Sequence, residues 1–480
     1  MNITLAVQST FKISRYLSRS ARRSFTMGST HPTSGVFKTR ILPIGATDAG
    51  HFEDPASLEK WITPTFDLES LHLAADHLKH SSIPVGFPTE TVYGLGADAT
   101  RSDAVKGIYK AKGRPSDNPL IIHVCDLTML RSLLSSSEGT DGSTADPIPE
   151  VYKPLIKAFW PGPLTILLPN PTPSKLAPEV TAGLPSFGAR MPSSPLALSL
   201  IHLAGVPLAA PSANASTRPS PTTAQHVLHD LDGRIEIILD GGPCQVGVES
   251  TVVDGLCDPP VVLRPGGVSI DCIRECEGWE KVLKGYKDAS EAGNQAPRAP
   301  GMKYKHYSPK AKVVLFETAL SPKNSTGTSS ELCNIMLALD KRIEHLGYEA
   351  LDRAPLIGII STKNWSEFGI LNCAKWEDDS GEPAPMVLQK QTVRTSNAFE
   401  MHRGELSRYT GPLNKRHVAD VLEIPLGGET KFIAQCLFSA LRELDLKGVD
   451  VIYVEGIEDE GDIAAAVMNR LRKAATIVNK

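Results

Sequence analysis

The chain has 480 residues, of which 41% are apolar and 22% are charged, and its net charge at pH 7 is −4. This length predicts roughly two to four domains, and this charge excludes a protein whose whole surface attracts nucleic acid or an anionic membrane. No apolar run approaches the ~18 residues needed to cross a bilayer, so we expect no membrane association. The eight cysteines lack zinc-ligand spacing and predict reduced thiols.

Residues 1–30 form a basic leader that is rich in Ser and Thr. They contain five Lys or Arg residues, and no acidic residue precedes Asp48. This composition is typical of a mitochondrial presequence, because a secretory signal would need a compact apolar segment; a disordered basic tail is the alternative. Translation from Met27 would remove the arginines. We therefore expect a cytoplasmic protein with an additional mitochondrial pool.

The middle of the chain alternates between helical and strand-like patterns. A helical run at residues 68–80 (LESLHLAADHLKH) leads into a strand-like run at residues 82–89 (SIPVGFPT), and further short β-rich and helical runs follow. This alternation predicts an α/β domain with a twisted, mixed and largely buried sheet. We place this domain at residues 61–278, after a leader and disordered segment at residues 1–60. The polar stretch 134–150 indicates a surface insertion.

The last third of the chain has a second α/β pattern. Residues 279–310 carry charge, Gly and Pro without apolar periodicity, and they are predicted to form a linker. Strand-like runs such as AKVVLFE and helical runs such as ETKFIAQCLFSALRELDLKG follow. Residues 311–480 therefore predict a smaller, Rossmann-like α/β domain.

The common phosphate and metal motifs are missing from the sequence. It contains no G-x-x-x-x-G-K-[ST] phosphate loop, no H-E-x-x-H zinc motif and no G-x-S-x-G nucleophile elbow. The run GLGADA at residues 94–99 lacks the third glycine of a dinucleotide fingerprint. Any phosphate site must therefore use other residues.

Residues 110–124 (KAKGRPSDNPLIIHV) place cations at the end of a predicted helix. We expect Ser102 or Asp103 to cap the start of that helix. It should end near Gly113, because the dipeptide that ends in Pro115 cannot continue it. A buried strand follows directly, so a short exit loop lies between two rigid elements, where binding sites are commonly positioned.

The cations of this segment, taken together with Lys106 on the preceding helix, divide into two pairs. Lys106 and Lys110 lie one turn apart on one helix face, and we interpret them as a solvated helix end that suits the helix dipole. Lys112 and Arg114 are expected on the exit loop. Their like charges repel each other unless an anion lies between them, and phosphate is the natural candidate because guanidinium binds it bidentately.

Three further segments are strands that end in polar loops. VPLAAPSAN ends in Ser212 and Asn214, with Ser220 shortly after; GVESTVVD contains Ser250; and PVVLRPGG ends in Arg264. Each could be an ordinary turn whose side chains bond their own backbone. Ligands of open α/β sheets bind where strand ends converge, so together these segments would offer hydroxyls, an amide and a guanidinium to an anion.

These segments resemble the threonylcarbamoyl-adenylate synthase family, which has a YrdC-like fold, in its two-domain, yeast-type form. The resemblance extends from about residue 62 to residue 480. Its motifs are PTETVYGLG (88–96), KGRP…NPL (112–120), PGPLT (161–165), PSAN (211–214), LRPG (263–266) and PGMKYKHYSP (300–309).

The resemblance implies a reaction with three substrates. L-Threonine and bicarbonate would form N-carboxythreonine, whose carboxylate attacks the α-phosphate of ATP and releases diphosphate. A separate transferase would then carry the group to adenosine 37 of certain tRNAs. Mg²⁺ is expected to arrive with ATP and to be held by its phosphates, because no acidic residue is clearly placed as a ligand.

The resemblance also implies roles for individual residues. Lys112 and Arg114 are the expected catalytic cations. The implied ATP ligands are Arg114, Asn118, Ser186, Ser212, Asn214, Ser220, Arg264 and Tyr307. The implied L-threonine ligands are Thr91, His123, Arg190, Ala210 through its backbone, and Ser250. Taken alone, His123 could be an ordinary core histidine, and Arg190 could be a surface residue.

The segment Lys303–Tyr307 (KYKHY) interleaves basic and aromatic residues. An ordered linker packed on the second domain is one interpretation. The other, supported by the family, is a lid that closes over the nucleotide and excludes water, with Tyr307 as its ATP contact.

Two competing functions remain. A double-stranded RNA- or tRNA-binding module would need a stripe of cations with stacking aromatics, whereas aromatic residues make up only 6% of this chain. A carbamoyltransferase of hydrogenase maturation shares the fold, but its zinc-finger cysteines and acylphosphatase domain are not visible in this sequence. We therefore expect an ATP-using synthase with little or no direct tRNA binding.

Overall fold

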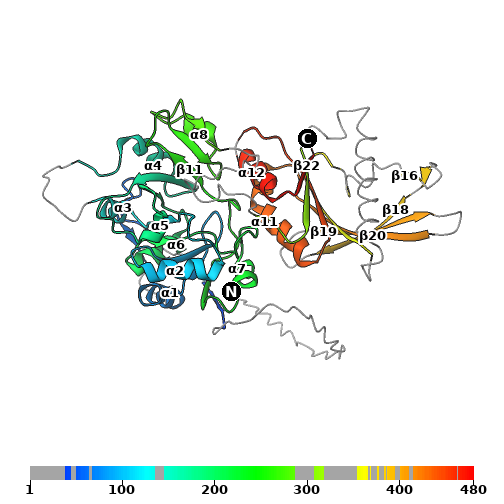
Figure 1. The fold of residues 1–480 in the computed structure, drawn as a ribbon, viewed down its shortest axis with the longest axis horizontal. Coiled ribbons are helices and arrows are strands. Elements are labelled where there is room, and N and C mark those ends of the chain that lie inside the picture. The colour runs from blue at the N-terminus through cyan, green and yellow to red at the C-terminus, as the bar shows by residue number, and fades with distance from the viewer. Residues whose placement is uncertain are drawn as a thin grey trace, which may run out of the picture. The chain divides into compact units, whose positions relative to one another are not determined.

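The computed structural model describes residues 38–44, 50–63, 68–135, 145–286, 307–317, 354–365, 368, 376–377, 383–384, 386–394, 400–409, 415–461 and 463–479. Two large sheets organise this part of the chain, one in each half of the sequence (Figure 1). The leader, most of the predicted linker and most of the KYKHY motif lie outside the described residues.

The sheet of the N-terminal half has eleven strands and mixes parallel with antiparallel pairs. Pairs such as β6–β8 and β7–β11 are parallel, whereas β4–β5 and β7–β8 are antiparallel. The predicted mixed sheet is therefore confirmed. In spatial order its strands are β1 (Arg40–Pro43), β10 (Ile237–Asp240), β4 (Val85–Phe87), β5 (Gly94–Asp98), β9 (Leu208–Ala209), β6 (Ile121–His123), β8 (Ser186–Arg190), β7 (Leu164–Pro169), β11 (Thr251–Asp254), β12 (Val261–Arg264) and β13 (Leu283–Lys284).

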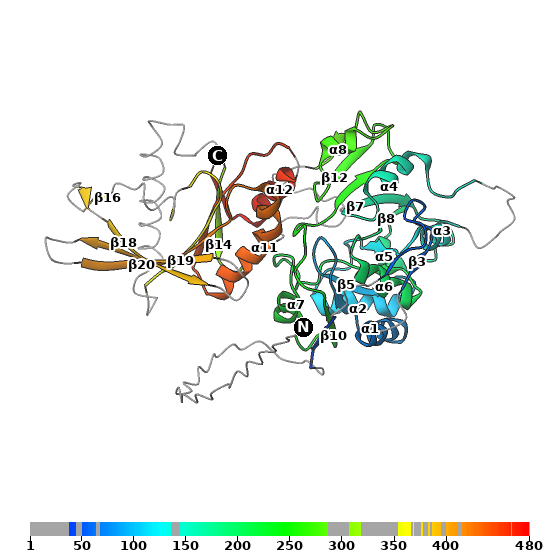
Figure 2. The ribbon, with the colours of Figure 1, turned by 180° about the vertical axis from the view of Figure 1, so that it is seen from behind.

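Short helices connect and cover these strands, and α1 packs against α6 (Figures 1 and 2). The α1 sequence explains that packing, because Leu71, Ala74, Ala75 and Leu78 share one helical face and are all buried. The helices are α1 (Glu69–His80), α2 (Ser102–Lys112), α3 (Leu127–Leu134), the 3₁₀ helix η1 (Glu150–Tyr152), α4 (Lys153–Phe159), α5 (Pro178–Thr181), α6 (Pro195–Ala204), α7 (Ala224–Leu231) and α8 (Ile270–Arg274); a small hairpin pairs β2 (His51–Phe52) with β3 (Trp61–Ile62).

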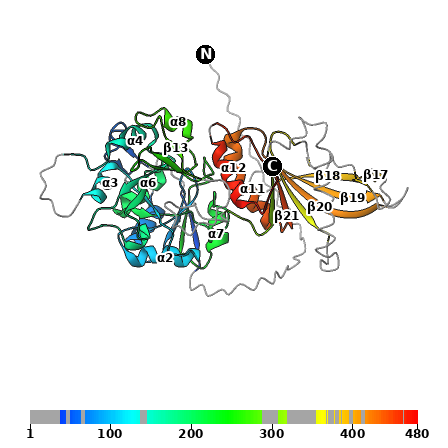
Figure 3. The ribbon, with the colours of Figure 1, turned by 45° about the horizontal axis from the view of Figure 1, so that its top comes forward.

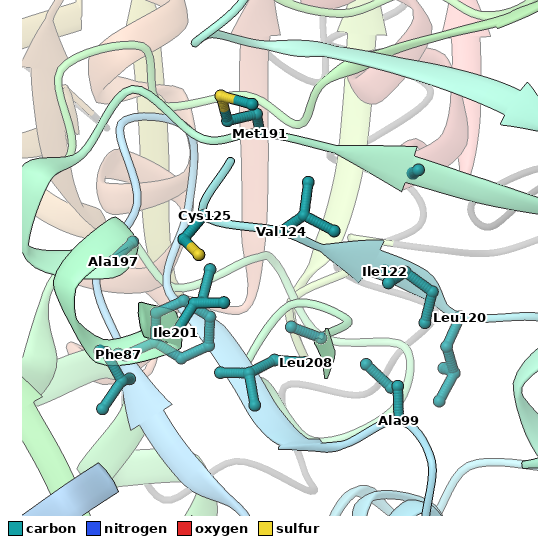
Figure 4. Packing of buried hydrophobic residues seen from close by; sticks show 14 of the residues in the cluster. Phe87, Ala99, Leu120, Ile122, Val124, Cys125, Met191, Ala197, Ile201 and Leu208 are labelled. Carbon is teal, nitrogen blue, oxygen red and sulfur yellow. The ribbon is translucent and has the colours of Figure 1, made fainter. Parts of the chain in front are cut away.

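Apolar side chains from strands and helices fill the core of this half. Figure 4 shows part of it, in which Cys125 and Ile201 lie near Phe87. Burial raises the pKa of the Cys125 thiol, with a further contribution from Asp126, so this cysteine is a neutral core residue. The described cysteines are all free, in agreement with the predicted reduced state.

The C-terminal half has a seven-stranded sheet in which five neighbouring strands are parallel. Its helices α11 and α12 lie against one another beside this sheet (Figure 3), which agrees with the predicted Rossmann-like fold. In spatial order the strands are β18 (Met386–Arg394), β19 (Glu400–Tyr409), β20 (Lys415–Pro425), β15 (Leu356–Ser361), β21 (Val451–Glu455), β14 (Lys312–Phe316) and β22 (Ile477–Asn479); the helices are α11 (Thr430–Leu446) and α12 (Ala464–Ala474), and a separate pair joins β16 (Trp376–Glu377) to β17 (Pro383–Ala384).

The N-terminal domain extends beyond the boundaries predicted for it. Strand β1 lies within the segment assigned to the leader and pairs with β10, so the domain begins before residue 61. Strand β13 and the fully buried Trp279 lie within the predicted linker, and β13 pairs with β12. The domain boundary was missed here because a search for apolar periodicity does not detect a single buried tryptophan in a polar segment.

A second apolar core joins the two halves of the sequence. Val92 and Val248 from the N-terminal half are in the same buried cluster as Leu437 and Phe438 of α11, and Tyr307 belongs to it as well. The two domains therefore share part of their core. None of the described helices is both long enough and apolar enough to cross a membrane.

Candidate active site

Helix α2 delivers the predicted cations to the centre of the N-terminal sheet. It ends at Lys112, and Gly113 follows with a left-handed φ of 61°, a conformation that glycine adopts without steric cost. The predicted end of the helix is thus confirmed. The predicted cap is wrong, because Arg101 occupies the N-cap position and no side chain caps the helix. Lys110 is exposed on α2, and Lys106 pairs with Glu179 at 3.1 Å, in agreement with the interpretation of both as a solvated helix end.

Lys112 does not lie on the exit loop, as predicted, but at the last position of α2. Its side chain is buried, and its ammonium group donates to the carbonyl oxygen atoms of Ser212 and Asn214, the latter at 2.6 Å. Burial, followed by the charge of Arg114, lowers the pKa of Lys112. The contact of Lys112 with the pocket is therefore indirect, through the loop that carries the PSAN motif.

The loop Ser212–Asn214 is held by its own side chains as well as by Lys112. The Ser212 hydroxyl donates to Oδ1 of Asn214 at 2.5 Å, and Nδ2 of Asn214 donates to the carbonyl oxygen atoms of Ala215 at 2.7 Å and Arg218 at 3.0 Å. Asn214 is fully buried. These bonds fix the backbone of the loop, so that Ser212 faces a cavity.

That cavity has an empty volume of about 550 Å³, including the solvent space at its mouth. Its walls come from strands and loops that are far apart in the sequence, as expected for a site at converging strand ends. Its lining contains all five predicted L-threonine residues and four of the predicted ATP residues. The lining residues are Thr89, Thr91, Val92, Gly94, Arg114, Ile121, His123, Arg190, Ala210, Pro211, Ser212, Glu249, Ser250, Arg264 and Tyr307.

Arg190 is the fixed cation of one side of the cavity. It ends β8, and its guanidinium donates to Oγ1 of Thr91 at 2.9 Å, to the carbonyl oxygen of Gly162 at 3.1 Å and to Oε1 of Glu90. Glu90 is itself buried and balances the arginine charge. The guanidinium is therefore held in one orientation before any ligand arrives.

His123 lies in the same part of the cavity and is neutral. Burial, assisted by the charge of Arg190, lowers its pKa to about 3. Nδ1 of the ring lies 3.4 Å from the carbonyl oxygen of Ile121. With Nδ1 as the donor to that oxygen, Nε2 is an acceptor for a ligand hydroxyl.

Arg264 and Ser250 form a second fixed pair on the wall of the cavity. Nε and Nη2 of Arg264 donate to the Ser250 carbonyl oxygen at 3.1 and 2.8 Å, and Nη2 also donates to the Ser250 hydroxyl at 3.1 Å. That hydroxyl is also 2.8 Å from Oγ1 of Thr165. Burial lowers the pKa of Arg264 to about 10, so it remains a cation at neutral pH.

Glu249 was not predicted from the sequence, although it precedes Ser250. Its carboxylate accepts hydrogen bonds from Ser220 at 2.5 Å and from Arg470 at 2.9 Å. Burial alone would raise its pKa, but the charges of Arg470 and Arg264 and the bond from Ser220 lower it to about 2. The signal that could have identified it is an acidic residue in a buried, strand-flanking motif, which needs a cationic partner.

Tyr307 is buried and has a left-handed φ of 70°. Its ring lies 5.2 Å from the Phe438 ring and 5.6 Å from the Arg470 guanidinium carbon. The next residue, Ser308, donates through its amide to the carbonyl oxygen of Thr217 at 2.9 Å. Burial, followed by the charge of Glu249, raises the pKa of Tyr307 to about 12. The other residues of the KYKHY motif lie outside the described part of the chain.

Two predicted ATP ligands carry buried polar atoms without a protein partner. Nε of Arg114 and Oδ1 of Asn118 make no hydrogen bond within the described residues. Burial lowers the pKa of Arg114 as well. Buried polar atoms are nearly always paired, and Arg114 lines the cavity, so its Nε is available to a ligand there.

Five predicted site residues do not line the cavity. Asn118 is buried, and its amide oxygen makes no hydrogen bond within the described residues. Ser186 begins β8, and Ser220 acts through Glu249. Lys112 and Asn214 act through the PSAN loop, as described above. Sequence motifs thus identified the segments of the site but did not separate lining residues from the residues that support them.

Possible metal ligands are few in the described part of the chain. Glu249 is the carboxylate of the cavity, and Ser220 and Arg470 already occupy its oxygen atoms. Cys125, Asp126 and His202 bring ligand atoms within 4.8 Å of one another in another place. There Asp126 caps α3 through the Met129 amide and accepts a bond from the Cys125 thiol, so these two residues already have protein partners.

Comparison with known proteins covers nearly the whole chain. A family model described as "Telomere recombination" matches residues 80–266, and one described as "Threonylcarbamoyl-AMP synthase, C-terminal domain" matches residues 268–476. The chain is 43% identical over 433 residues to a threonylcarbamoyl-AMP synthase of Schizosaccharomyces pombe, covering 87% of this chain and 91% of that protein. It is 41% identical to the Bacillus subtilis protein of the same name, covering 84% and 92%.

A solved structure resembles this one over both domains. It is P. abyssi Sua5 complexed with L-threonine, at 35% identity and a TM-score of 0.61, and the match covers 85% of this chain and 96% of that one.

Proposed function

The chain belongs to the threonylcarbamoyl-AMP synthase family, and we propose that it converts L-threonine, bicarbonate and ATP into threonylcarbamoyl-AMP and diphosphate. It is thus a nucleotidyltransferase. The observation that carries this proposal is the shared cavity, in which the residues expected for an amino acid and those expected for a nucleotide face the same space.

L-Threonine is proposed to occupy the side of the cavity that contains Thr91, His123, Arg190, Ala210 and Ser250. Arg190 would bind the α-carboxylate, since Glu90 and Thr91 already hold its guanidinium in place. The neutral His123 would bond the threonine hydroxyl. P. abyssi Sua5, which resembles this chain over both domains, has been solved in complex with L-threonine, which supports an amino-acid site in this fold.

ATP is proposed to occupy the side with Arg114, Ser212, Arg264 and Tyr307, next to Asn118. Arg114 and Arg264 would neutralise the polyphosphate, and the free Arg114 Nε and Asn118 Oδ1 atoms would find their partners there. Mg²⁺ would enter as part of MgATP, held by phosphate oxygen atoms, because the Glu249 carboxylate is already engaged by Ser220 and Arg470.

The proposed chemistry needs positioning and charge stabilisation from the protein. The threonine nitrogen attacks the carbon of bicarbonate, water leaves, and a carboxylate oxygen of the resulting N-carboxythreonine then attacks the α-phosphorus. The new bond joins that oxygen to phosphorus, and the bond between the α-phosphorus and the bridging oxygen breaks as diphosphate departs. Arg114 and Arg264 suit the developing charge on the phosphoryl group.

Tyr307 and the residues before it are proposed to act as a lid over the nucleotide. The position of Tyr307 in the lining of the cavity supports this role, because a segment that closes there would exclude water from the carbamate and the mixed anhydride. The labile product would then pass to a separate transferase that modifies tRNA. The cations of the site are buried or partly buried rather than arranged as a surface stripe, which favours a small anionic ligand over RNA.

The direct test of the proposed function is the release of diphosphate by the purified full chain. We expect release to require MgATP, L-threonine and bicarbonate together, and to stop when any one of them is omitted. Diphosphate release that continues without L-threonine would identify a different ATP-cleaving enzyme and refute the proposal.

We also propose two cellular pools, cytoplasmic and mitochondrial, on the composition of residues 1–30. Fusing this segment to a fluorescent reporter should direct the reporter to mitochondria, whereas a fusion that starts at Met27 should remain in the cytoplasm. A uniformly cytoplasmic signal from the longer fusion would remove the mitochondrial pool.

A further inference from the structure

The C-terminal domain contributes a buried arginine to the edge of the proposed ATP site. Arg470 lies on α12 and is 1% exposed. Its Nε donates to Oε2 of Glu249 at 2.9 Å, and its Nη1 donates to the carbonyl oxygen of Pro265 at 2.6 Å. Both partners belong to the N-terminal domain: Glu249 lines the cavity and Pro265 directly follows Arg264. Nη2 is buried and makes no hydrogen bond within the described residues.

The same guanidinium also lies over the Tyr307 ring, with its carbon 5.6 Å from the ring centroid. Tyr307 and Glu249 both line the cavity. A single side chain from the C-terminal domain therefore contacts the acidic residue of the cavity, the backbone beside Arg264 and the proposed lid residue. A separated N-terminal domain would lack this side chain, because α12 carries it.

We propose that Arg470 is a positioning residue of the ATP half of the site, supplied by the C-terminal domain. This proposal rests on the proposed function, since it assigns the polyphosphate to this side of the cavity. Its main action is through Glu249, whose carboxylate would otherwise face ATP without its hydrogen-bonded cation. It also fixes the backbone that aims Arg264 and the ring of Tyr307.

The threonine half does not depend on Arg470 in the same way. The guanidinium of Arg190 bonds Glu90, Thr91 and Gly162, which all belong to the N-terminal domain. Loss of Arg470 should therefore weaken ATP binding much more than L-threonine binding. A purely structural residue would instead lower stability or affect both substrates alike.

Helix α12 offers a matched control two residues away. Arg472 is a half-turn from Arg470, and its ion pairs join it to Glu317 at 2.8 Å and to Asp459 at 2.6 Å, both in the C-terminal domain. Arg472→Ala therefore removes an ion-paired arginine from the same helix without touching the cavity. We expect it to leave the KM for ATP within about threefold of the parent value.

The experiment measures diphosphate release by full-length variants, with kcat and KM determined separately for ATP and L-threonine. Arg470→Ala is expected to raise the KM for ATP about 10- to 100-fold and to change the KM for L-threonine less than about threefold. Adding Glu249→Gln to Arg470→Ala should recover most of the ATP affinity, because the negative charge of the carboxylate is then gone. Arg470→Lys keeps the positive charge but loses the planar guanidinium with its several donors. Its KM for ATP should therefore lie between those of the parent and of Arg470→Ala.

Three results would overturn the proposal: an equal change in both KM values, a fall in melting temperature with unchanged kinetics, or no recovery in the double variant. If Arg470→Ala does not fold, Arg470→Lys and the double variant are compared with Arg472→Ala by the same criteria. Calorimetric binding of a non-hydrolysable ATP analogue separates this proposal from the proposed function. Selective loss of that binding would support the role of Arg470 even in a chain that releases no diphosphate, and unchanged binding would refute it.

Discussion

At the level of single residues, Lys112 and Arg114 are two neighbouring cations with different surroundings. Lys112 is the last residue of α2 and holds the carbonyl groups of Ser212 and Asn214. Arg114 lines the cavity and has a free Nε atom. Both residues belong to the same sequence motif. Only the course of the backbone after Gly113 shows that Lys112 supports the PSAN loop and that Arg114 lines the cavity. Their substitutions should therefore fail in different ways.

Arg114→Ala is expected to reduce the rate of diphosphate release by about 10²–10³, because it removes a preorganised cation, with little change in melting temperature. Lys112→Ala should lower the melting temperature as well, since it leaves two buried carbonyl groups without their donor. Enzyme kinetics and thermal unfolding measure the two effects. Lys110→Ala, on the exposed face of α2, is the control. Equal kinetics and equal melting temperatures for the two variants would contradict these assignments.

Discrimination against serine rests on one methyl group. Val92, Ile121 and Ala210 provide apolar surface in the cavity, and burial of a methyl group there is worth only ~1–3 kcal/mol. We expect serine to be used with a kcat/KM about 10- to 200-fold below that of threonine, because its hydroxyl can still reach His123. A competition assay with both amino acids measures this ratio, and complete exclusion of serine would contradict the expectation.

At the level of elements, helices α11 and α12 pack beside the C-terminal sheet and also contact the N-terminal domain. Arg442 of α11 donates to the Pro219 carbonyl oxygen and to both oxygen atoms of Asp230 on α7, and Asp230 in turn accepts a bond from the Ala215 amide. Arg470 of α12 holds Glu249. Each helix thus supplies one buried arginine to a buried carboxylate near the ends of the PSAN and GVES segments.

A fragment of residues 35–286 is therefore expected to be less stable than the full chain and poorly active. It would expose Val92 and Val248, remove Arg470 from Glu249 and remove Arg442 from Asp230, which would keep only Arg218. Breaking one buried pair typically costs about 3–5 kcal/mol. Denaturant unfolding and diphosphate release test both parts. A fragment with the stability and activity of the full chain would show that the C-terminal domain is dispensable.

Elements and motifs were easier to predict from the sequence than contacts. The end of α2 followed from Gly113 and Pro115, and the mixed sheet followed from alternating apolar runs, because both depend on local chemistry. Glu249 was not predicted, because its partner Arg470 is 221 residues away and no local pattern joins the two. Strand β13 and Trp279 were missed because a short edge strand in a charged segment has no clear period.

At the level of the whole molecule, two buried histidines should make stability depend on pH. Burial, assisted by Arg190 for His123 and Arg442 for His226, lowers the pKa of each from 6.5 to about 3 in the folded state. Below pH 6.5 the unfolded chain therefore binds protons that the folded chain does not. Stability is fully present above pH 6.5 and falls as the pH decreases towards 3.

Each histidine contributes a slope of up to about 1.4 kcal/mol per pH unit in that range. Urea unfolding at several pH values should show this decline, and His226→Gln, which lies outside the cavity, should reduce the slope. Glu249 adds a loss in the same direction between pH 4.5 and 2, because its folded pKa is depressed to about 2. Stability that is independent of pH between 6.5 and 4.5 would contradict burial of these histidines in the neutral form.

The central claim is that one cavity joins a carboxylated amino acid to the α-phosphate of ATP. Incubation of the purified full chain with MgATP, L-threonine and ¹⁴C-bicarbonate tests it most directly, with nucleotides separated by chromatography and diphosphate measured in parallel. We expect a labelled adenylate that forms in equal amount with diphosphate and is lost when Arg114 is replaced by Ala. Diphosphate without label in the nucleotide, or a labelled adenylate that forms unchanged in the Arg114→Ala variant, would contradict it.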